Sequence, residues 1–332
     1  MKSAPYADSK FQIPRINQIS DTTQRPLWSV MIPTFNCAGY LRQTLQSVLA
    51  QDAGPDQMQI EVVDDCSTKD DPQAVVQELG HGRVSFYRLP QNEGAVQNFN
   101  TCIERSLGHY VHILHGDDWV APGYYQTIAE LARCHPNLGL YATRSFFVNE
   151  DSVITAVSPR LPTLEQPSKS ATPFYYDCPL EFPGVTVRRT AYEALGGFRP
   201  ALLHTADRET WARVVAGQGG IVSSEVMGFY RVSASSHTSR MVGTAENVRD
   251  MCRVHTIFAD CYPDFSATRA KSLAAELAWN QYRQFDLSGD KVAASENWRM
   301  WRELTPILRQ TAQRVVTAVR PAIGKIVFGD RM

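Results

Sequence analysis

The sequence lacks any apolar stretch of the about 20 residues that a membrane-spanning helix requires. Its first residues are polar and lack the apolar core of a signal peptide, so we expect a cytoplasmic protein. Charge of one sign is not in excess either, because 33 Lys and Arg residues stand against 34 Asp and Glu. A net charge of −1 argues against nucleic acid as a partner.

Cysteine is present in a pattern that excludes two common structural uses. The chain has 7 cysteines and no CxxC pair, which supports neither a zinc knuckle nor a disulfide framework. Free thiols in a reducing compartment are the better interpretation. What the sequence does have is 332 residues, 43% of them hydrophobic, enough for one large core or two smaller ones.

From residue 28 onward, short apolar stretches alternate with stretches of helical periodicity. In the first helical stretch, apolar side chains recur at i, i+4, i+7 and i+8, which places them on one helix face. The expected strands are 29–33, 60–63, 84–89, 110–114 and 138–143, and the expected helices are 38–51, 72–79, 95–107 and 123–134. This alternation predicts an α/β fold with a mainly parallel sheet and helices on both faces.

The regular alternation stops after residue 147. Residues 157–175 are rich in Pro, Ser and Thr and predict a long surface loop. A second block then carries expected strands at 184–188 and 221–230 and expected helices at 190–195 and 207–216. Beyond residue 245 the pattern predicts helices only, so we expect a helical C-terminal extension.

Two adjacent carboxylates, Asp117 and Asp118, follow the expected strand 110–114. In open α/β sheets, ligands bind at the carboxyl ends of the strands. Magnesium-type cations take oxygen ligands and commonly bind one or two carboxylates together with substrate phosphates. The pair therefore indicates a metal that also holds a diphosphate, although such pairs also cap helices or lie in water.

Three other polar segments, at 33–36, 64–67 and 92–100, also follow expected strands. Because the carboxyl ends of parallel strands share one edge of a sheet, we expect these segments and 115–118 to line one cleft.

Six stretches of sequence, taken together and in order, resemble those of a known family. They are SVMIPTFNCAGYLRQTLQSVLAQ, EVVDDCSTKD, NEGAVQNFNTCIERSLGHYV, LHGDDW, GGFRPALLHTADRETWARV and FYRVSASSHTS. Over residues 28 to about 232 the chain resembles the family 2 glycosyltransferases, inverting enzymes of the GT-A fold. The resemblance implies a nucleoside diphosphate sugar as donor, a saccharide or lipid-linked saccharide as acceptor, and Mn²⁺ or Mg²⁺ as cofactor. It also implies a role in assembling cell-surface polysaccharide.

The resemblance assigns the donor to a defined set of residues. They are Pro33, Thr34, Phe35, Asp65, Asn92, Gly94, Asn100, His115, Asp118 and Arg231. Asp65 would accept a hydrogen bond from the base, and Asn92 and Gly94 would let the backbone approach the donor. Without the resemblance, Asp65 is a helix cap and residues 92–94 are a turn. Phe99 stands where the family commonly has Arg, which removes one cationic contact to the diphosphate.

The resemblance makes Asp117 the metal ligand, with Asp118 as a second ligand or a ribose contact. His115 replaces the first acid of the family's Asp-X-Asp-Asp loop and would face the donor ribose. In the closing segment, Arg231 would offset the charge of the leaving diphosphate, and His237 is a further candidate metal ligand. Purely structural roles are the alternative for all three basic residues.

Asp207 is the candidate general base. Inversion at an anomeric carbon requires the acceptor hydroxyl to lose its proton while it attacks, and a nearby carboxylate can take that proton. Ala206 precedes it where the family commonly has an acid, so Asp207 carries the assignment, with Glu209 as the fallback. The alternative is that Asp207 only caps the helix that it begins.

The C-terminal stretch 299–332 carries seven Lys and Arg residues against two acidic ones, interleaved with aliphatic side chains and preceded by Trp298. This pattern is typical of a helix on anionic lipid at the cytoplasmic face of the membrane, or of a helix packed on the catalytic domain.

These inferences divide the chain into an arm (1–27), a catalytic domain (28–242) and a helical region (243–332). The catalytic domain would comprise a nucleotide-binding half (28–143) and an acceptor half (144–242). Two other functions remain open. A sugar nucleotidyltransferase would need a Gly-rich cationic loop after the first strand, where Arg42 is the nearest cation. A protein of the same fold could also bind nucleotide sugar or glycan without turnover.

Overall fold

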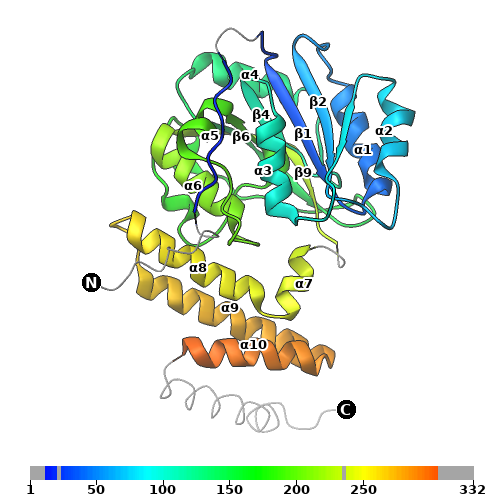
Figure 1. Cartoon of the computed structure of the whole chain (residues 1–332). Coiled ribbons are helices and arrows are strands. Elements are labelled where there is room, and N and C mark those ends of the chain that lie inside the picture. Colours follow the sequence, from blue (N-terminus) through cyan, green and yellow to red (C-terminus); the bar gives the residue numbers. More distant parts are fainter. Residues whose placement is uncertain (1–11, 21–23, 234–236, 306–332) are drawn as a thin grey trace, which may run out of the picture. The chain divides into compact units, whose positions relative to one another are not determined.

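The computed structural model describes residues 12–20, 24–233 and 237–305 (Figure 1). The chain divides into two compact units, Met1–Ala234 and Ser235–Met332. All strands of the described residues lie in the first unit, and the described part of the second unit is helical.

A single mixed sheet organises the first unit. Its nine strands run in the order β3-β2-β1-β4-β8-β6-β9-β5, with β7 paired to β6. The strands are β1 (Trp28–Thr34), β2 (Met58–Asp64), β3 (Ser85–Arg88), β4 (Tyr110–Ile113), β5 (Trp119–Val120), β6 (Leu140–Val148), β7 (Ile154–Val157), β8 (Val185–Arg188) and β9 (Gly220–Arg231). The α/β prediction is confirmed.

Strands β1 to β4 pair in parallel, as the alternation of strands and helices predicts. Strand β8 runs antiparallel to both β4 and β6, and β5 runs antiparallel to β9, which the sequence pattern did not indicate. Parallel neighbours need a helical crossover, whereas β8 follows a long irregular connection that leaves either direction open.

Helices cover both faces of the sheet (Figure 1). They are α1 (Ala38–Leu49), α2 (Pro72–Gly80), α3 (Ala95–Arg105), α4 (Tyr124–Cys134), α5 (Arg189–Leu195) and α6 (Ala206–Gln218). Leu41, Leu45 and Val48 of α1 share one core with β1, β2 and α4, which confirms the helical face predicted from their spacing. Helix α3 contacts β1, β2 and β4, while α5 contacts β8 and α6 contacts β6.

The segment 12–20 has no helix or strand, as expected of an arm, but it packs closely on the first unit. The Pro14 carbonyl accepts the N–H of Gly197 at 2.9 Å, and the Asn17 carbonyl accepts from the Arg189 guanidinium at 3.1 Å. Ile16 is only 4% exposed. The arm therefore supports the turn after α5.

The connection between β6 and β8 is more ordered than a plain loop. It contains β7 and three short 3₁₀ helices, η2 (Pro162–Leu164), η3 (Thr172–Phe174) and η4 (Phe182–Gly184). Leu164 and Phe174 are fully buried, so two apolar side chains anchor the stretch that its Pro, Ser and Thr content predicted as surface loop.

The second unit consists of α7 (His237–Gly243), α8 (Glu246–Cys261), α9 (Ala267–Ser288) and α10 (Lys291–Leu304). Trp301 is 4% exposed and its ring lies 4.8 Å from that of Trp279, so this part of the amphipathic stretch packs within the unit itself. Residues 306–332, on which most of the predicted membrane contact depends, lie outside the described residues.

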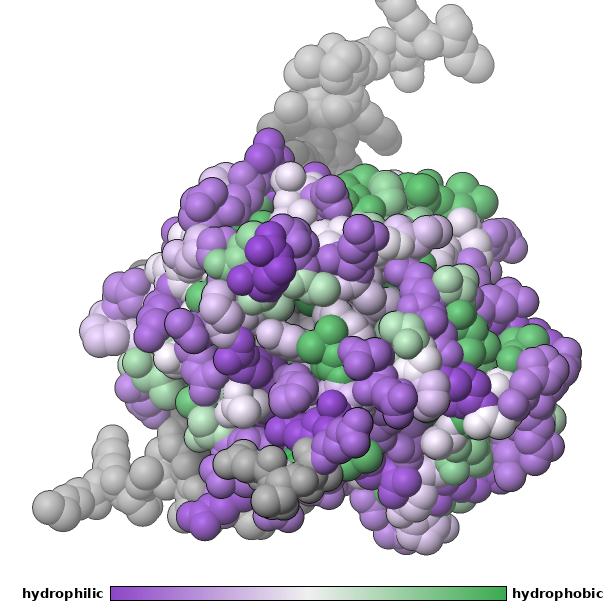
Figure 2. Space-filling model, turned by 90° about the horizontal axis from the view of Figure 1, so that it is seen from above, coloured by the Kyte–Doolittle hydropathy of each residue, from purple (hydrophilic) through white to green (hydrophobic). Residues whose placement is uncertain are grey.

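No helix that the structure describes has both the length and the apolar character needed to span a bilayer. Figure 2 shows one face of the molecule, where hydrophilic side chains predominate and hydrophobic ones form smaller groups between them.

Candidate active site

The carboxyl ends of β1, β2 and β4 are tied together by backbone hydrogen bonds. The Thr34 carbonyl accepts from Asp65 N at 2.9 Å, and the Pro33 carbonyl accepts from Gly116 N at 3.0 Å. A Cβ added at Gly116 would lie 2.8 Å from Thr34 Oγ1, so this close approach requires glycine. Three of the polar segments expected to share an edge therefore meet there.

At this edge Asp65 shapes the loop that precedes α3. Its carboxylate accepts the N–H groups of Glu93 at 2.7 Å and Gly94 at 3.0 Å, and Asn92 Nδ2 donates to its carbonyl at 3.1 Å. Burial raises the pKa of Asp65. Gly94 has φ of 88°, a conformation that favours glycine. Asp65 and Asn92 thus fix the backbone that the donor was expected to approach.

Of Pro33, Thr34 and Phe35, all expected to bind the donor, Phe35 is the one whose side chain is open to solvent. It is 41% exposed, whereas Pro33 lies buried in β1 and Thr34 is 3% exposed. Thr34 Oγ1 shares a hydrogen bond with Cys37 Sγ at 2.8 Å. Of these three residues, Phe35 has the ring on which a base could stack.

Asn100 has no free hydrogen-bonding group for a donor. It is 1% exposed, its Nδ2 donates to the Phe198 carbonyl at 2.9 Å, and its Oδ1 accepts from Phe198 N at 2.8 Å. This geometry favours a structural role, because both ends of the amide hold the segment after α5.

A cluster of three side chains could hold a metal ion. One ligand atom each from His115, Asp117 and Asp118 lie within 4.8 Å of one another. Asp118 Oδ2 and His115 Nε2 are buried and have no hydrogen-bond partner within the part of the chain that the structure describes. Orphaned acceptors of this kind fit a divalent cation. The side chain of His237, the third candidate ligand, lies outside the described residues.

Residues 115–118, called the metal loop below because they carry the candidate metal ligands, are held from three directions. Arg231 N donates to Asp118 Oδ1 at 2.8 Å, and Thr44 Oγ1 donates to the Asp118 carbonyl at 2.7 Å. The His115 ring stacks on Phe99 with centroids 4.9 Å apart and lies 4.3 Å from the Phe182 ring. Two of the three departures from the family pattern, His115 and Phe99, are therefore in direct contact.

Burial sets the protonation of this group. It lowers the pKa of His115 to about 4, so the imidazole is neutral near pH 7 and has a lone pair for a metal. Burial, and then the Asp117 charge, raises the pKa of Asp118 well above its usual range. A cation would relieve this unfavourable burial of negative charge.

Arg231, expected to face the diphosphate, is used within the protein. It is 3% exposed and stacks over Tyr40 at 4.2 Å and Trp119 at 5.0 Å. Its guanidinium donates to the carbonyls of Asp117 (3.0 Å), Asn149 (3.0 Å) and Glu150 (2.9 Å), to Gln43 Oε1 (2.8 Å) and to Ser152 Oγ (3.1 Å). Its geometry favours a role in positioning the metal loop.

Asp207 lies in the first turn of α6, as predicted. Its Oδ1 accepts the N–H of Arg208 at 2.7 Å, and burial raises its pKa, while the Arg208 bond and the nearby His204 lower it. Glu209, the fallback base, is 2% exposed and is engaged by Arg199 and Arg213, each at 3.0 Å. Asp207 is therefore the freer of the two carboxylates.

Tyr230 connects the metal group with Asp207. Burial, followed by the charges of Glu181, Asp118, Asp117 and Asp207, raises the pKa of its hydroxyl. The Phe182 ring likewise lies 4.3 Å from His115 and 5.5 Å from Trp211, which is one turn beyond Asp207 on α6. Residues far apart in the chain thus lie close together in the fold.

Sequence reasoning missed two residues in this cleft, Glu181 and Tyr230. Burial, and then the charges of Asp207 and Asp177, raises the pKa of Glu181 to about 8. Glu181 belongs to no recognisable sequence motif, because it lies in the irregular connection between β6 and β8. Tyr230 lies next to Arg231, in the stretch FYRVSASSHTS that the resemblance had already identified.

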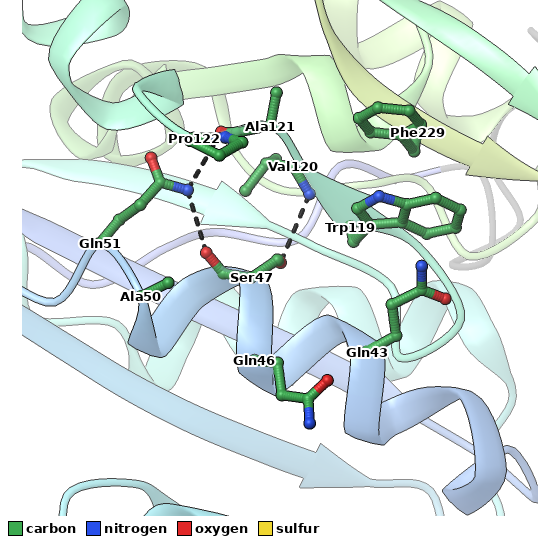
Figure 3. Close-up of a pocket in the computed structure, with 10 residues that line it drawn as sticks. All are labelled: Gln43, Gln46, Ser47, Ala50, Gln51, Trp119, Val120, Ala121, Pro122 and Phe229. Atoms are coloured by element: carbon green, nitrogen blue, oxygen red, sulfur yellow. Dashed lines mark hydrogen bonds between the residues drawn. The ribbon is translucent and has the colours of Figure 1, made fainter.

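A separate surface pocket of about 400 Å³ lies between α1 and strands β5 and β9 (Figure 3). The stacked rings of Trp119 and Phe229, 4.7 Å apart, form one wall, and Gln43, Gln46 and Gln51 project from α1 and its end. The carboxylates that act on Tyr230 do not line this pocket, so the pocket is separate from the candidate active site.

Comparison with known proteins identifies the family. The sequence profile described as glycosyl transferase family 2 matches residues 29–193. An uncharacterized protein of Mycobacterium tuberculosis is 28% identical over 255 residues, which cover 72% of this chain and 77% of that protein. The putative teichuronic acid biosynthesis glycosyltransferase TuaG of Bacillus subtilis is 35% identical over 99 residues, 29% of this chain and only 38% of TuaG.

Solved structures share the fold. S. aureus TarS 1-349 in complex with UDP-GlcNAc has a TM-score of 0.58 at 18% identity, covering 83% of this chain and 79% of that one. The mannosyltransferase PcManGT from Pyrobaculum calidifontis, in complex with GDP-Man and Mn²⁺, has a TM-score of 0.54 at 16% identity, covering 85% and 84%. The chain therefore belongs to glycosyl transferase family 2 and has the GT-A fold.

Proposed function

We propose that the protein is an inverting hexosyltransferase that moves a sugar from a nucleoside diphosphate sugar to a hydroxyl group of a saccharide or lipid-linked saccharide. The observation that carries the proposal is the packing of the Phe182 ring 4.3 Å from His115 on one side and 5.5 Å from Trp211, one turn beyond Asp207, on the other. In agreement with this placement, the charges of Asp117, Asp118 and Asp207 all act on Tyr230. One end of the cleft can hold a cation and the other offers a carboxylate base. Polysaccharide assembly is the setting that the description of TuaG as a putative teichuronic acid biosynthesis glycosyltransferase supports.

In this mechanism Asp207 accepts the proton of the acceptor hydroxyl as its oxygen attacks the anomeric carbon. Attack from the face opposite the diphosphate inverts the configuration. The Arg208 N–H and the nearby His204 favour the ionised carboxylate, while burial makes it more basic than an exposed aspartate.

The donor binds at the edge formed by β1, β2 and β4. The Phe35 ring offers a stacking surface to the base, and Asp65 holds the loop 92–94 beside it. His115, Asp117 and Asp118 would bind the divalent cation, which when bound offsets the charge of the diphosphate leaving group.

Two substitutions test this assignment. Asp207→Asn should retain the rise in melting temperature caused by UDP or GDP with Mn²⁺, yet lose about 10²- to 10⁴-fold of transfer, because the amide cannot accept the proton. Asp117→Asn should lose the Mn²⁺-dependent part of that rise. The exposed Asp56→Asn is the matched control and should change neither.

Release of free nucleoside diphosphate, with UDP-GlcNAc, UDP-glucose, UDP-galactose and GDP-mannose as donors, measures turnover. Turnover of Asp207→Asn near that of the unchanged protein would remove the proposed base. Binding of these donors without any release would instead favour a protein that binds nucleotide sugar without catalysis.

A further inference from the structure

Glu181 lies on the segment between the metal group and Asp207. It directly precedes η4, whose Phe182 ring packs 4.3 Å from His115 on one side and 5.5 Å from Trp211 on the other. Gly184, at the end of η4, is closely fitted, since an added Cβ would lie 2.6 Å from the Thr143 carbonyl. The backbone at Glu181 is therefore fixed between the two halves of the site.

The Glu181 side chain is partly buried and interacts electrostatically with both halves of the site. Its charge acts on Asp118 of the metal loop, on Cys178 and on Tyr230 of β9, in each case as a contribution smaller than burial. Among the charges that act on Glu181 itself, Asp207 of α6 comes first and Asp177 second. Asp207 therefore has a larger electrostatic effect on the Glu181 carboxyl group than the metal ligands have.

No other group satisfies this carboxyl group. Among the described residues, no hydrogen bond or ion pair reaches the Glu181 side chain, whereas the buried Glu209 nearby has two arginine partners. Burial disfavours the ionised form of this group, while part of the side chain remains accessible. A partly accessible carboxyl group without a protein partner is available to a ligand.

We propose that Glu181 binds the acceptor sugar: its carboxyl group hydrogen-bonds one hydroxyl of the acceptor and holds the neighbouring, reactive hydroxyl against Asp207. This inference rests on the proposed function, since it requires a sugar acceptor at that end of the cleft. Glu181, from the β6–β8 connection, would then be the second acid beside Asp207, at a site where Ala206 has no carboxyl group.

Of two interacting carboxyl groups, the one that ionises first raises the pKa of the other, so one of them keeps a proton. Because Asp207 has a hydrogen-bond donor in Arg208 N and Glu181 has none, Asp207 is the ionised member and Glu181 the neutral acid. Glu181 then donates one hydrogen bond to the acceptor and accepts another. During transfer the reactive hydroxyl's proton passes to Asp207, the new C–O bond forms, and the bond to the diphosphate breaks with its electron pair, while Glu181 keeps its proton.

The test compares Glu181→Gln with Glu181→Ala in the full chain. The donor is whichever of the four named nucleotide sugars gives the fastest nucleoside diphosphate release, and the acceptors are p-nitrophenyl β-glycosides. Glu181→Ala should raise the acceptor KM about tenfold and leave the donor KM within about twofold. Glu181→Gln should stay near the unchanged protein at pH 7, because an amide both donates and accepts as the neutral acid does.

The pH profile separates this role from a structural one. In the unchanged protein the rate should fall above about pH 8, where Glu181 ionises beside Asp207, and that fall should be absent in Glu181→Gln. Asp56→Asn is again the control. The rise in melting temperature with UDP and Mn²⁺ should be equal in all of these proteins.

An unchanged acceptor KM in Glu181→Ala, or an alkaline fall that persists in Glu181→Gln, would overturn the inference and leave the proposed function standing. If Glu181→Ala does not fold, the pH profile of Glu181→Gln decides. Absence of release from every donor by the unchanged protein would instead overturn the proposed function and this inference with it.

Discussion

The guanidinium of Arg231 offers the sharpest test of how the metal loop is held. Replacing it with methionine keeps most of the side-chain length and apolar contact but removes every side-chain donor. The backbone bond from residue 231 to Asp118 remains in any variant, so the change isolates the guanidinium. Arg231→Lys is the matched control, because lysine keeps the charge but lacks the planar fork that reaches several acceptors.

The magnitude follows from the acceptors that lose their partner. Three backbone carbonyls and two side-chain oxygens accept from this group. At about 1 kcal/mol for each buried acceptor left unpaired, and with water replacing the donor at the two side chains, Arg231→Met should lower the free energy of unfolding by about 3 kcal/mol. Arg231→Lys should lose about half as much.

The metal site should respond as well, because the carbonyl of Asp117 is one of the five acceptors. Loss of a group that orients metal ligands commonly weakens metal binding about 10- to 100-fold, and we expect about tenfold for Arg231→Met. Urea unfolding measures the stability, and electron paramagnetic resonance of free Mn²⁺ measures the affinity. An Arg231→Met protein with unfolding free energy within about 1 kcal/mol of the original and unchanged Mn²⁺ affinity would refute the reasoning.

Two more outcomes test the fold around the site. Asn100→Ala should lower the free energy of unfolding by about 2 kcal/mol by leaving Phe198 N and O unpaired, yet leave the UDP-dependent melting shift intact; loss of that shift would return Asn100 to the donor site. Burial holds the pKa of the fully buried His112 at about 3, against 6.5 for an ordinary histidine, so the native state resists protonation while the unfolded chain accepts it. The free energy of unfolding should therefore decrease as the pH falls below about 6.5, by about 2 kcal/mol at pH 5. His112→Gln should lack this part of the acid sensitivity. Urea midpoints at pH 7 and pH 5 measure the difference.

The sequence predicts the strands and helices of the first half well, because helical and strand periodicities are local. The direction of β8 is not local, since it depends on how the preceding connection crosses the sheet. The loop 115–118 and Asp207 stand out in the sequence for the same reason as the strands, because each lies at the end of a regular element. Glu181 does not stand out, because its proposed role depends on its position near Asp207 in the fold.

Charged residues also show what the sequence alone could not predict. Arg231 and Glu209 are the residue types that substrate sites use, and their positions matched a functional segment. The structure instead shows both fully buried and paired within the protein. A sequence gives the charge of a side chain, but only the fold determines whether that charge has already been neutralised.

The stacking of His115 on Phe99 means that the effects of these two departures from the family pattern should not be treated as independent. The effects of changing them should be coupled, because the apolar ring that stands in place of a cation contacts the imidazole that stands in place of an acid. Restoring only one partner would set an aspartate against the Phe99 ring, or an arginine against the His115 ring. The double reversion should therefore be milder than the sum of the single ones, and a double-mutant cycle would express that coupling as an energy.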